Sequence, residues 1–229
     1  MHSFPVLFDF DPGIYVKVLV DWLTVNFQGF FDALTVGVKW IVFNIHDLLT
    51  FIPWFLFIFL IFLLGWRLKN FKSGLGYAIM FTTIGLIGLW SEMIFTLSIV
   101  ITSVIISILI GVPVGIYSAY NQKLEAFLKP LLDGMQTMPS FVYLIPAMIF
   151  FGLGTVPAIF ATIVYSTPPC IRLTSLAIKS VPGEMREAAY AFGSSRWQAL
   201  IKVELPQAMP TIMAGINQTT MMAMSMVVI

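Results

Sequence analysis

Long apolar stretches recur along this chain and constrain its fold more than any other feature. The segment from Leu48 to Trp66 contains no charged residue, and about 20 apolar residues are enough for a helix to cross a bilayer. Across all 229 residues, 59% are hydrophobic and only 10% are charged, whereas a soluble domain carries roughly 25% charged residues. The sequence therefore predicts an all-α, polytopic membrane protein.

Six membrane spans are expected from these stretches. They are Leu48–Trp66, Gly74–Trp90, Met93–Tyr120, Gln136–Phe151, Thr155–Ile178 and Pro210–Ile229. The fourth and fifth spans are interrupted by prolines at positions 139, 146, 157, 168 and 169. Broken helices are tolerated at membrane depth only where protein or a water-filled cavity satisfies the freed backbone groups. These two spans are therefore expected inside the protein.

The amino-terminal segment, residues 1–47, has a different pattern. Polar residues recur every three or four positions and form one stripe along a helix from Ile14 to Ile45, at Lys17, Asp21, Thr24, Gln28, Asp32, Thr35 and Lys39. Trp22 and Trp40 lie off this stripe. An amphipathic helix of this kind suits the membrane interface better than a crossing of the bilayer. The alternative is a helix packed on the protein's own spans.

Basic residues indicate the orientation. If the spans alternate, Lys17 and Lys39 fall on one side, and the other ten basic residues fall on the opposite side. Cytoplasmic loops carry the excess of Lys and Arg. The amino terminus is therefore expected outside, and the polar loop around Glu187 is expected in the cytoplasm.

That polar loop, residues 179–206, separates two apolar stretches. It is expected to form two short helices, with Gly193 in the left-handed turn that ends the first and Ser194 or Ser195 capping the second. Pro206 is expected to mark a change of direction. The small side chains of Ala188, Ala189 and Ala191 would let another protein approach closely.

The loop resembles the coupling loop of permease subunits of ABC importers, which docks in a groove of the ATPase subunit. The matching residues are Glu187, Ala188, Ala189, Gly193, Leu205 and Pro206. Val203 stands where isoleucine is commoner in the family. The resemblance implies that this loop couples ATP hydrolysis to transport. The alternative is an ordinary surface helix pair between two spans.

Two further segments, Leu131–Ala147 and Gly215–Met226, resemble the permease of glycine betaine/proline betaine importers, a branch of the type I ABC importers. The resemblance covers about residues 93–229 and implies a permease core there, preceded by two additional helices in 48–92. It also implies a bacterial plasma-membrane location and an assembly of two permeases, two cytoplasmic ATPases and an external binding protein or fused binding domain. The family core has five helices, but only four follow Trp90, so the last helix is expected to be missing.

Polar side chains inside the predicted spans are candidates for the transport path, because burial of such groups without partners is costly. The candidates are Gln136, Thr137, Ser140, Tyr143, Asn217, Gln218 and Ser225. The alternative, hydrogen bonding between helices, carries more weight for any single one of them.

Several functions find no support in the sequence. The chain has two histidines and one cysteine, which argues against a histidine metal site or a catalytic pair. It has no phosphate-binding G-x-x-x-x-G-K-[ST] motif, so ATP and Mg²⁺ are expected on a partner ATPase. A net charge of +1 gives no electrostatic reason to expect nucleic acid. Two alternatives remain: a permease for an amino acid such as methionine, and a non-transporting membrane scaffold or intramembrane enzyme.

Overall fold

The computed structural model describes residues 12–139 and 141–227, and within these ranges the chain is helical and contains no strand. The expected all-α fold is confirmed. The elements are α1 (Pro12–Asn26), α2 (Gln28–Phe51), α3 (Trp54–Leu68), α4 (Phe71–Leu86), α5 (Trp90–Tyr120), α6 (Gln122–Thr137), α7 (Phe141–Phe151), α8 (Thr155–Lys179), α9 (Gly183–Ala191), α10 (Arg196–Ala199), the π-helical turn η1 (Leu200–Glu204) and α11 (Leu205–Val227).

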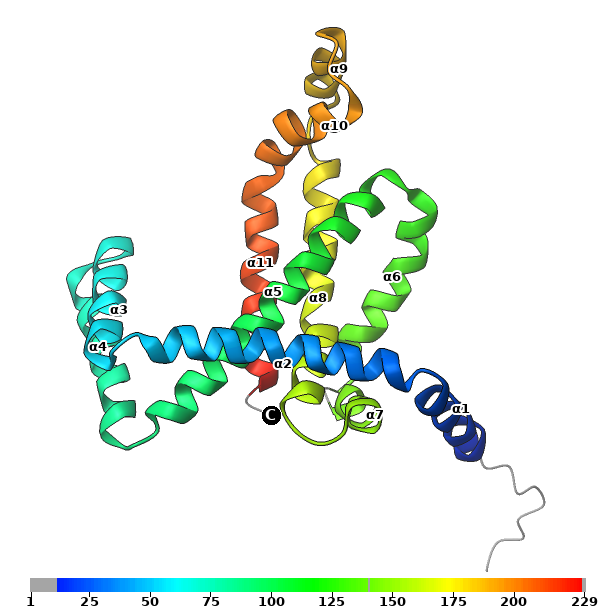
Figure 1. Cartoon of the computed structure of the whole chain (residues 1–229). Helices are drawn as coiled ribbons and strands as arrows, with labels where there is room; N and C mark the ends of the chain where they lie inside the picture. Colours follow the sequence, from blue (N-terminus) through cyan, green and yellow to red (C-terminus); the bar gives the residue numbers. More distant parts are fainter. Residues whose placement is uncertain (1–11, 140, 228–229) are drawn as a thin grey trace, which may run out of the picture.

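Helix α8 is the centre of the fold, with α5 and α11 packed along it (Figure 1). Small residues allow the close approach of α5. Gly111 faces Cys170 and Gly115 faces Thr174, both at distances that leave no room for a side chain on the glycine. Small residues four positions apart are the usual basis of tight helix contacts in membranes.

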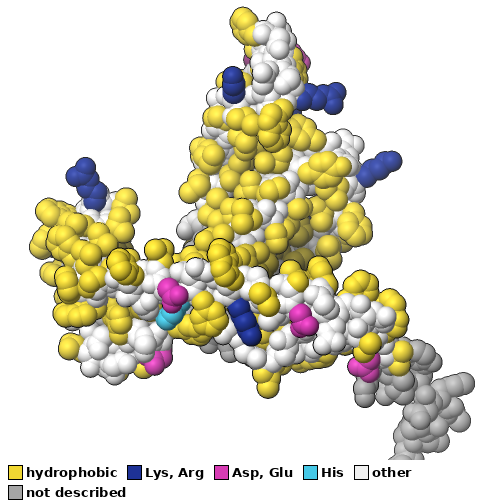
Figure 2. Space-filling view, in the orientation of Figure 1, with side chains coloured by type: hydrophobic (Ala, Val, Ile, Leu, Met, Phe, Trp, Pro, Cys, Tyr) yellow, Lys and Arg dark blue, Asp and Glu magenta, His cyan; other side chains and the backbone are white. Residues whose placement is uncertain are grey.

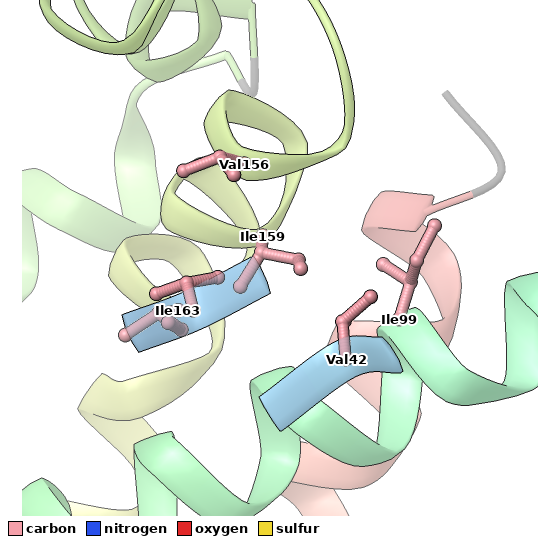
Figure 3. Packing of buried hydrophobic residues seen from close by; sticks show 6 residues of the cluster. Val42, Ile99, Val156, Ile159 and Ile163 are labelled. Carbon is pink, nitrogen blue, oxygen red and sulfur yellow. The ribbon is translucent and has the colours of Figure 1, made fainter. Parts of the chain in front are cut away.

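Helix α2 runs crosswise to α8 and α11 (Figure 1) and packs on α5, α7 and α8. Its buried side chains Val38 and Val42 join Ile99 of α5 and Ile159 and Ile163 of α8 in one hydrophobic cluster (Figure 3). These contacts agree with the alternative given for the amino-terminal segment, a helix packed on the protein's own spans. The stripe residues Asp21, Gln28, Asp32 and Lys39 are exposed, as an amphipathic helix requires.

The amino-terminal segment is not one continuous helix. A turn at Phe27, with φ of −112° and ψ of 18°, separates α1 from α2. Aromatic contacts hold α2 beyond this turn, because the ring of Phe31 stacks on Phe150 at 4.8 Å and meets Phe151 edge-on at 5.6 Å. The prediction of a single helix from Ile14 to Ile45 is corrected in this respect.

The boundaries of the predicted spans also change. The stretch expected from Leu48 to Trp66 is divided at Pro53, because the residue before it, Ile52, is extended and ends α2. Helices α3 and α4, of 15 and 16 residues, are shorter than the roughly 20 residues of a typical span. Among the described residues, three helices are long and apolar enough to cross a membrane by length and composition, namely α2, α5 and α8.

The expected fourth span is a bent pair of helices. Helix α6 begins at Gln122, before the predicted start of this span at Gln136, and α7 follows at an angle of 99°. Ion pairs fix α6 on α8: the Arg172 guanidinium lies 2.5 Å from the Asp133 carboxylate, and Lys179 pairs with Glu125. Counting α6 and α7 as one span gives up to four spans, not the six expected.

The distribution of apolar and charged side chains on the surface is that of a membrane protein. Figure 2 shows an apolar face over the α5–α8–α11 bundle, with basic side chains toward the end where α9 and α10 project and also on α2, and acidic ones mainly along α2. A charge-free apolar band flanked by polar ends is what a bilayer requires.

Candidate coupling site

The coupling segment, defined here as residues 179–206, projects beyond one end of the helix bundle (Figure 1). Helix α8 ends at Lys179, and Pro182, with φ of −55°, immediately precedes α9. Val181 is buried in a cluster with Ile178 of α8 and Ala208 of α11. The segment is therefore anchored at its base while its tip stands free of the bundle.

Gly193 makes the turn between the two short helices, as the sequence predicts. Its φ is +80°, a conformation that costs a residue with a Cβ about 1–2 kcal/mol. The Gly193 N–H donates to the Tyr190 carbonyl at 2.9 Å, and the Ser194 N–H donates to the Ala189 carbonyl at 3.0 Å. These bonds satisfy carbonyls at the end of α9.

Of the two serines proposed as caps, Ser195 caps α10. Its hydroxyl accepts a bond from the Gln198 N–H at 3.3 Å, and the Gln198 side chain accepts one from the Ser195 N–H at 2.9 Å. This reciprocal pair is a capping box. The turn and the cap together fix how α10 folds back beside α9.

The alanines of the motif have different environments. Ala189 is buried, and its helix α9 packs on α10 and η1. Ala188, Ala191 and Glu187 are exposed. Ala189 is therefore enclosed by the chain itself, whereas the other three residues can meet a partner.

Two large aromatic side chains of the coupling segment are exposed, which the motif did not predict. Phe192 is 91% exposed and Trp197 is 68% exposed. A cleft opens beside them, lined by Tyr120, Gly183, Arg186, Glu187, Tyr190, Ser194, Ser195, Arg196, Trp197 and Leu200. Exposed aromatic residues next to a cleft are typical of protein-binding surfaces.

The end of the motif is helical. Helix continues from α10 through η1 into α11, and the chain bends between α10 and α11 (Figure 1). Pro206 directly follows the π turn η1, and local π adjustments allow a helix to accommodate proline. Leu205 is half-buried, and its N–H donates to the Leu200 carbonyl across the π turn. The change of direction expected at Pro206 stays a prediction for that residue.

The predicted path residues fall into two groups. Gln136 and Thr137 end α6, and the Tyr143 hydroxyl of α7 donates to the Met135 carbonyl at 2.7 Å, which joins the two helices. Ser140 lies outside the described residues. In this first group, Tyr143 therefore agrees with the alternative to a transport-path role, which is hydrogen bonding between helices.

The second group lies on α11. Asn217 and Gln218 are exposed, and the exposed Ser225 donates its hydroxyl to the Met221 carbonyl at 3.0 Å. Helix α11 packs on α8 and α5, and among the described residues it makes no substantial contact with α6 or α7. One copy of the chain therefore does not pack the helices of the two groups against each other.

Comparison with known proteins identifies the family. Residues 111–229, which include the coupling segment and both groups of path residues, match the family of binding-protein-dependent transport system inner membrane components. This chain belongs to that family. It is a non-enzymatic, multi-pass membrane subunit of a transport system.

Individual relatives cover more of the chain than the family model does. The glycine betaine transport system permease protein OpuAB of Bacillus subtilis is 47% identical over 210 residues, which are 92% of this chain and 74% of that protein. The glycine betaine/carnitine transport permease protein GbuB of Listeria monocytogenes is 46% identical over 222 residues, which are 94% of this chain and 77% of that protein.

A third relative is longer. The glycine betaine/proline betaine transport system permease protein ProW of Escherichia coli is 43% identical over 210 residues, which are 92% of this chain and 59% of that protein. The three names refer to betaines or carnitine, so the alternative of a permease for an amino acid such as methionine is less supported.

One charged residue of this permease was missed by the sequence reasoning. Glu204 is 1% exposed in η1, and it accepts a hydrogen bond from the hydroxyl of Tyr120, the last residue of α5. Among the described residues, its other oxygen, Oε1, has no hydrogen-bond partner. The available signal was a single acidic residue between the apolar Val203 and Leu205.

Proposed function

We propose that this permease is a transmembrane subunit of an ATP-driven importer for glycine betaine or a related quaternary-ammonium osmoprotectant. The names of the relatives support the solute, because they are more than 40% identical over at least 92% of the chain. The family supports an external binding protein as the source of solute. ATP and Mg²⁺ belong to a cytoplasmic ATPase, of which two copies serve two permeases.

The ATPase docks on the coupling segment in this proposal. The observation that carries it is the exposure of Phe192 and Trp197 on a capped helix pair that projects from the bundle. Aromatic residues are enriched among the few residues that dominate binding energy at protein interfaces. Glu187 and Ala188 of the motif, both exposed, would lie in the same contact.

The orientation follows from the same contact. Because the ATPase is cytoplasmic, the coupling segment faces the cytoplasm, together with the basic end of the bundle in Figure 2. Helix α2 then lies at the outer surface, and the amino terminus is outside.

A second permease copy covers the exposed face of α11. Asn217, Gln218 and Ser225 lie on this face, and polar groups within a spanning helix usually face protein or a water-filled cavity instead of lipid. Pairing two copies through this face would place the α11 group along a shared path for the zwitterionic solute. The α6–α7 group, with Gln136, Thr137 and Tyr143, would then line a more distant part of the path.

The test reconstitutes the permease with its ATPase and binding protein in vesicles and measures uptake of labelled glycine betaine and of labelled methionine. Phe192→Ala and Trp197→Ala should each weaken binding of the ATPase by about 30-fold, the equivalent of about 2 kcal/mol at an interface hot spot. Phe127→Ala is the matched control, because Phe127 is also 68% exposed but lies on α6.

Two results would contradict the proposal. Binding of the ATPase at wild-type strength by both tip variants would show that the coupling segment is not the dock. Uptake of methionine in place of glycine betaine would leave the dock intact and make the solute assignment wrong.

A further inference from the structure

Glu204 is a buried acid at a junction of three elements. It ends η1, the π-helical turn that joins the coupling segment to α11, and its partner Tyr120 ends α5. Burial of a carboxylate is costly unless it is hydrogen-bonded. The bond therefore links the carboxyl-terminal end of α5 to the base of the coupling segment.

The surroundings of Glu204 do not require a charge. The neighbouring Leu200 belongs to an apolar cluster that also contains Ile178 of α8 and Ala208 and Ile212 of α11. An apolar side chain of similar size in place of a buried charged group is often neutral or stabilising. Packing alone therefore does not account for an acid at this position.

The π turn η1 determines the orientation of the Glu204 side chain. In η1 the Leu205 N–H donates to the carbonyl of Leu200, five residues back, and this wider turn shifts the side chains relative to a regular α-helix. Turns of this kind are rare and often occur at functional sites. Tyr120 also lines the cleft of the coupling segment with Arg186 and Tyr190 of α9. The Tyr120 side chain thus adjoins the docking helix as well as η1.

We propose that Tyr120 and Glu204 are positioning residues that couple α5 to the movement of the docking helices. Helix α11 follows any displacement of α9 and α10 because η1 continues directly into it. Helix α5 has no such covalent link, and the Tyr120–Glu204 bond supplies a polar one. A displacement at the tip then moves α5 and α11 together. This inference rests on the proposed function of the coupling segment.

The test compares Tyr120→Phe with Tyr117→Phe in the full chain, assembled with its ATPase in lipid nanodiscs. Tyr117 lies one turn earlier on α5 and is 62% exposed, so its variant is a matched control. Tyr120→Phe removes only the hydroxyl and leaves the carboxylate without its donor. Glu204→Gln keeps an oxygen that can accept the same bond and serves as the conservative variant.

Hydrogen exchange in the permease reports the link without reference to transport. Tyr120→Phe should raise exchange by about tenfold, equivalent to about 1.4 kcal/mol, both at the end of α5 and in η1. Tyr117→Phe should change neither region, and Glu204→Gln should stay near the wild type. Unchanged exchange in both regions of the Tyr120→Phe variant would overturn the link, whatever the transport function is.

The ratio of ATP hydrolysed to solute imported reports the coupling. Tyr120→Phe should raise this ratio severalfold while the ATPase stays bound, and the separate variant Glu204→Gln should leave the ratio near the wild-type value. A merely structural role would lower the amount of assembled complex and leave the ratio unchanged, and that result would overturn the positioning role. Failure of the proposed function would be visible separately, because the wild-type permease would then not bind the ATPase.

Discussion

The contact between α5 and α8 gives a sharp prediction, because it depends on glycine, which has only a hydrogen atom where any other residue has a side chain. A Cβ on Gly115 would lie 2.6 Å from the Thr174 Cβ and 2.8 Å from the Ile171 carbonyl oxygen. Carbon atoms in contact prefer about 3.5–4.0 Å. Gly115→Ala therefore requires the two helices to separate locally by about 1 Å.

The expected cost is that of overpacking, about 1–3 kcal/mol. For a chain of this size, each kcal/mol lowers the melting temperature by about 2–4 °C, so Gly115→Ala should lower it by about 2–12 °C. Gly111→Ala should fall in the lower part of this range. A Cβ there would meet the Cys170 Cβ and Sγ, both at 2.8 Å, but no backbone atom closer than 3.6 Å.

The assay uses the single cysteine of the chain. Cys170 is completely buried and faces α5, so a thiol-reactive dye should label it only when α5 and α8 separate. Labelling of the purified permease during heating gives the melting temperature of this contact. Gly134→Ala is the control, because a Cβ on Gly134 meets nothing within 4 Å. An unchanged melting temperature for Gly115→Ala, or an equal fall for Gly134→Ala, would refute the reasoning.

Two further predictions concern the coupling segment. Gly193→Ala forces a Cβ into a φ of +80° and should raise hydrogen exchange in α9 and α10 by about 5–30-fold, the equivalent of about 1–2 kcal/mol, whereas the control Gly183→Ala should not. Equal exchange in the two variants would contradict the assigned turn. Ser194→Cys in a Cys170→Ala background should react with a membrane-impermeant thiol reagent only after cells are permeabilised, and reaction in intact cells would reverse the proposed orientation.

The local structure of the coupling segment could be predicted because its determinants are adjacent in sequence. Gly193 ends α9 and Ser195 caps α10, and each acts within about four residues of its own position. Pro206 shows the limit of the same logic. The proline alone did not indicate that helix would continue on both sides of it; the π turn η1 directly precedes Pro206, and local π adjustments allow a helix to accommodate proline.

Contacts between distant elements could not be predicted in this way. Glu204 and Tyr120 are 84 positions apart, and neither carries a local signal that names the other. The same holds for Gly111 and Gly115, which are visible in the sequence as small residues four apart, although the helix that they meet is not. The division at Pro53 was visible, but the apolar run around it suggested one continuous span.

The position of α2 depends on contacts between residues that are far apart in the sequence. By length and composition α2 could cross a membrane, yet its buried Val42 meets Ile99 near the start of α5 and Ile159 near the start of α8. Both of these helices run from that end toward the coupling segment. Helix α2 therefore lies across the end of the bundle opposite α9 and α10. If the coupling segment faces the cytoplasm, as proposed, α2 lies at the outer membrane surface, where its polar stripe can face water while Val38 and Val42 cover the bundle.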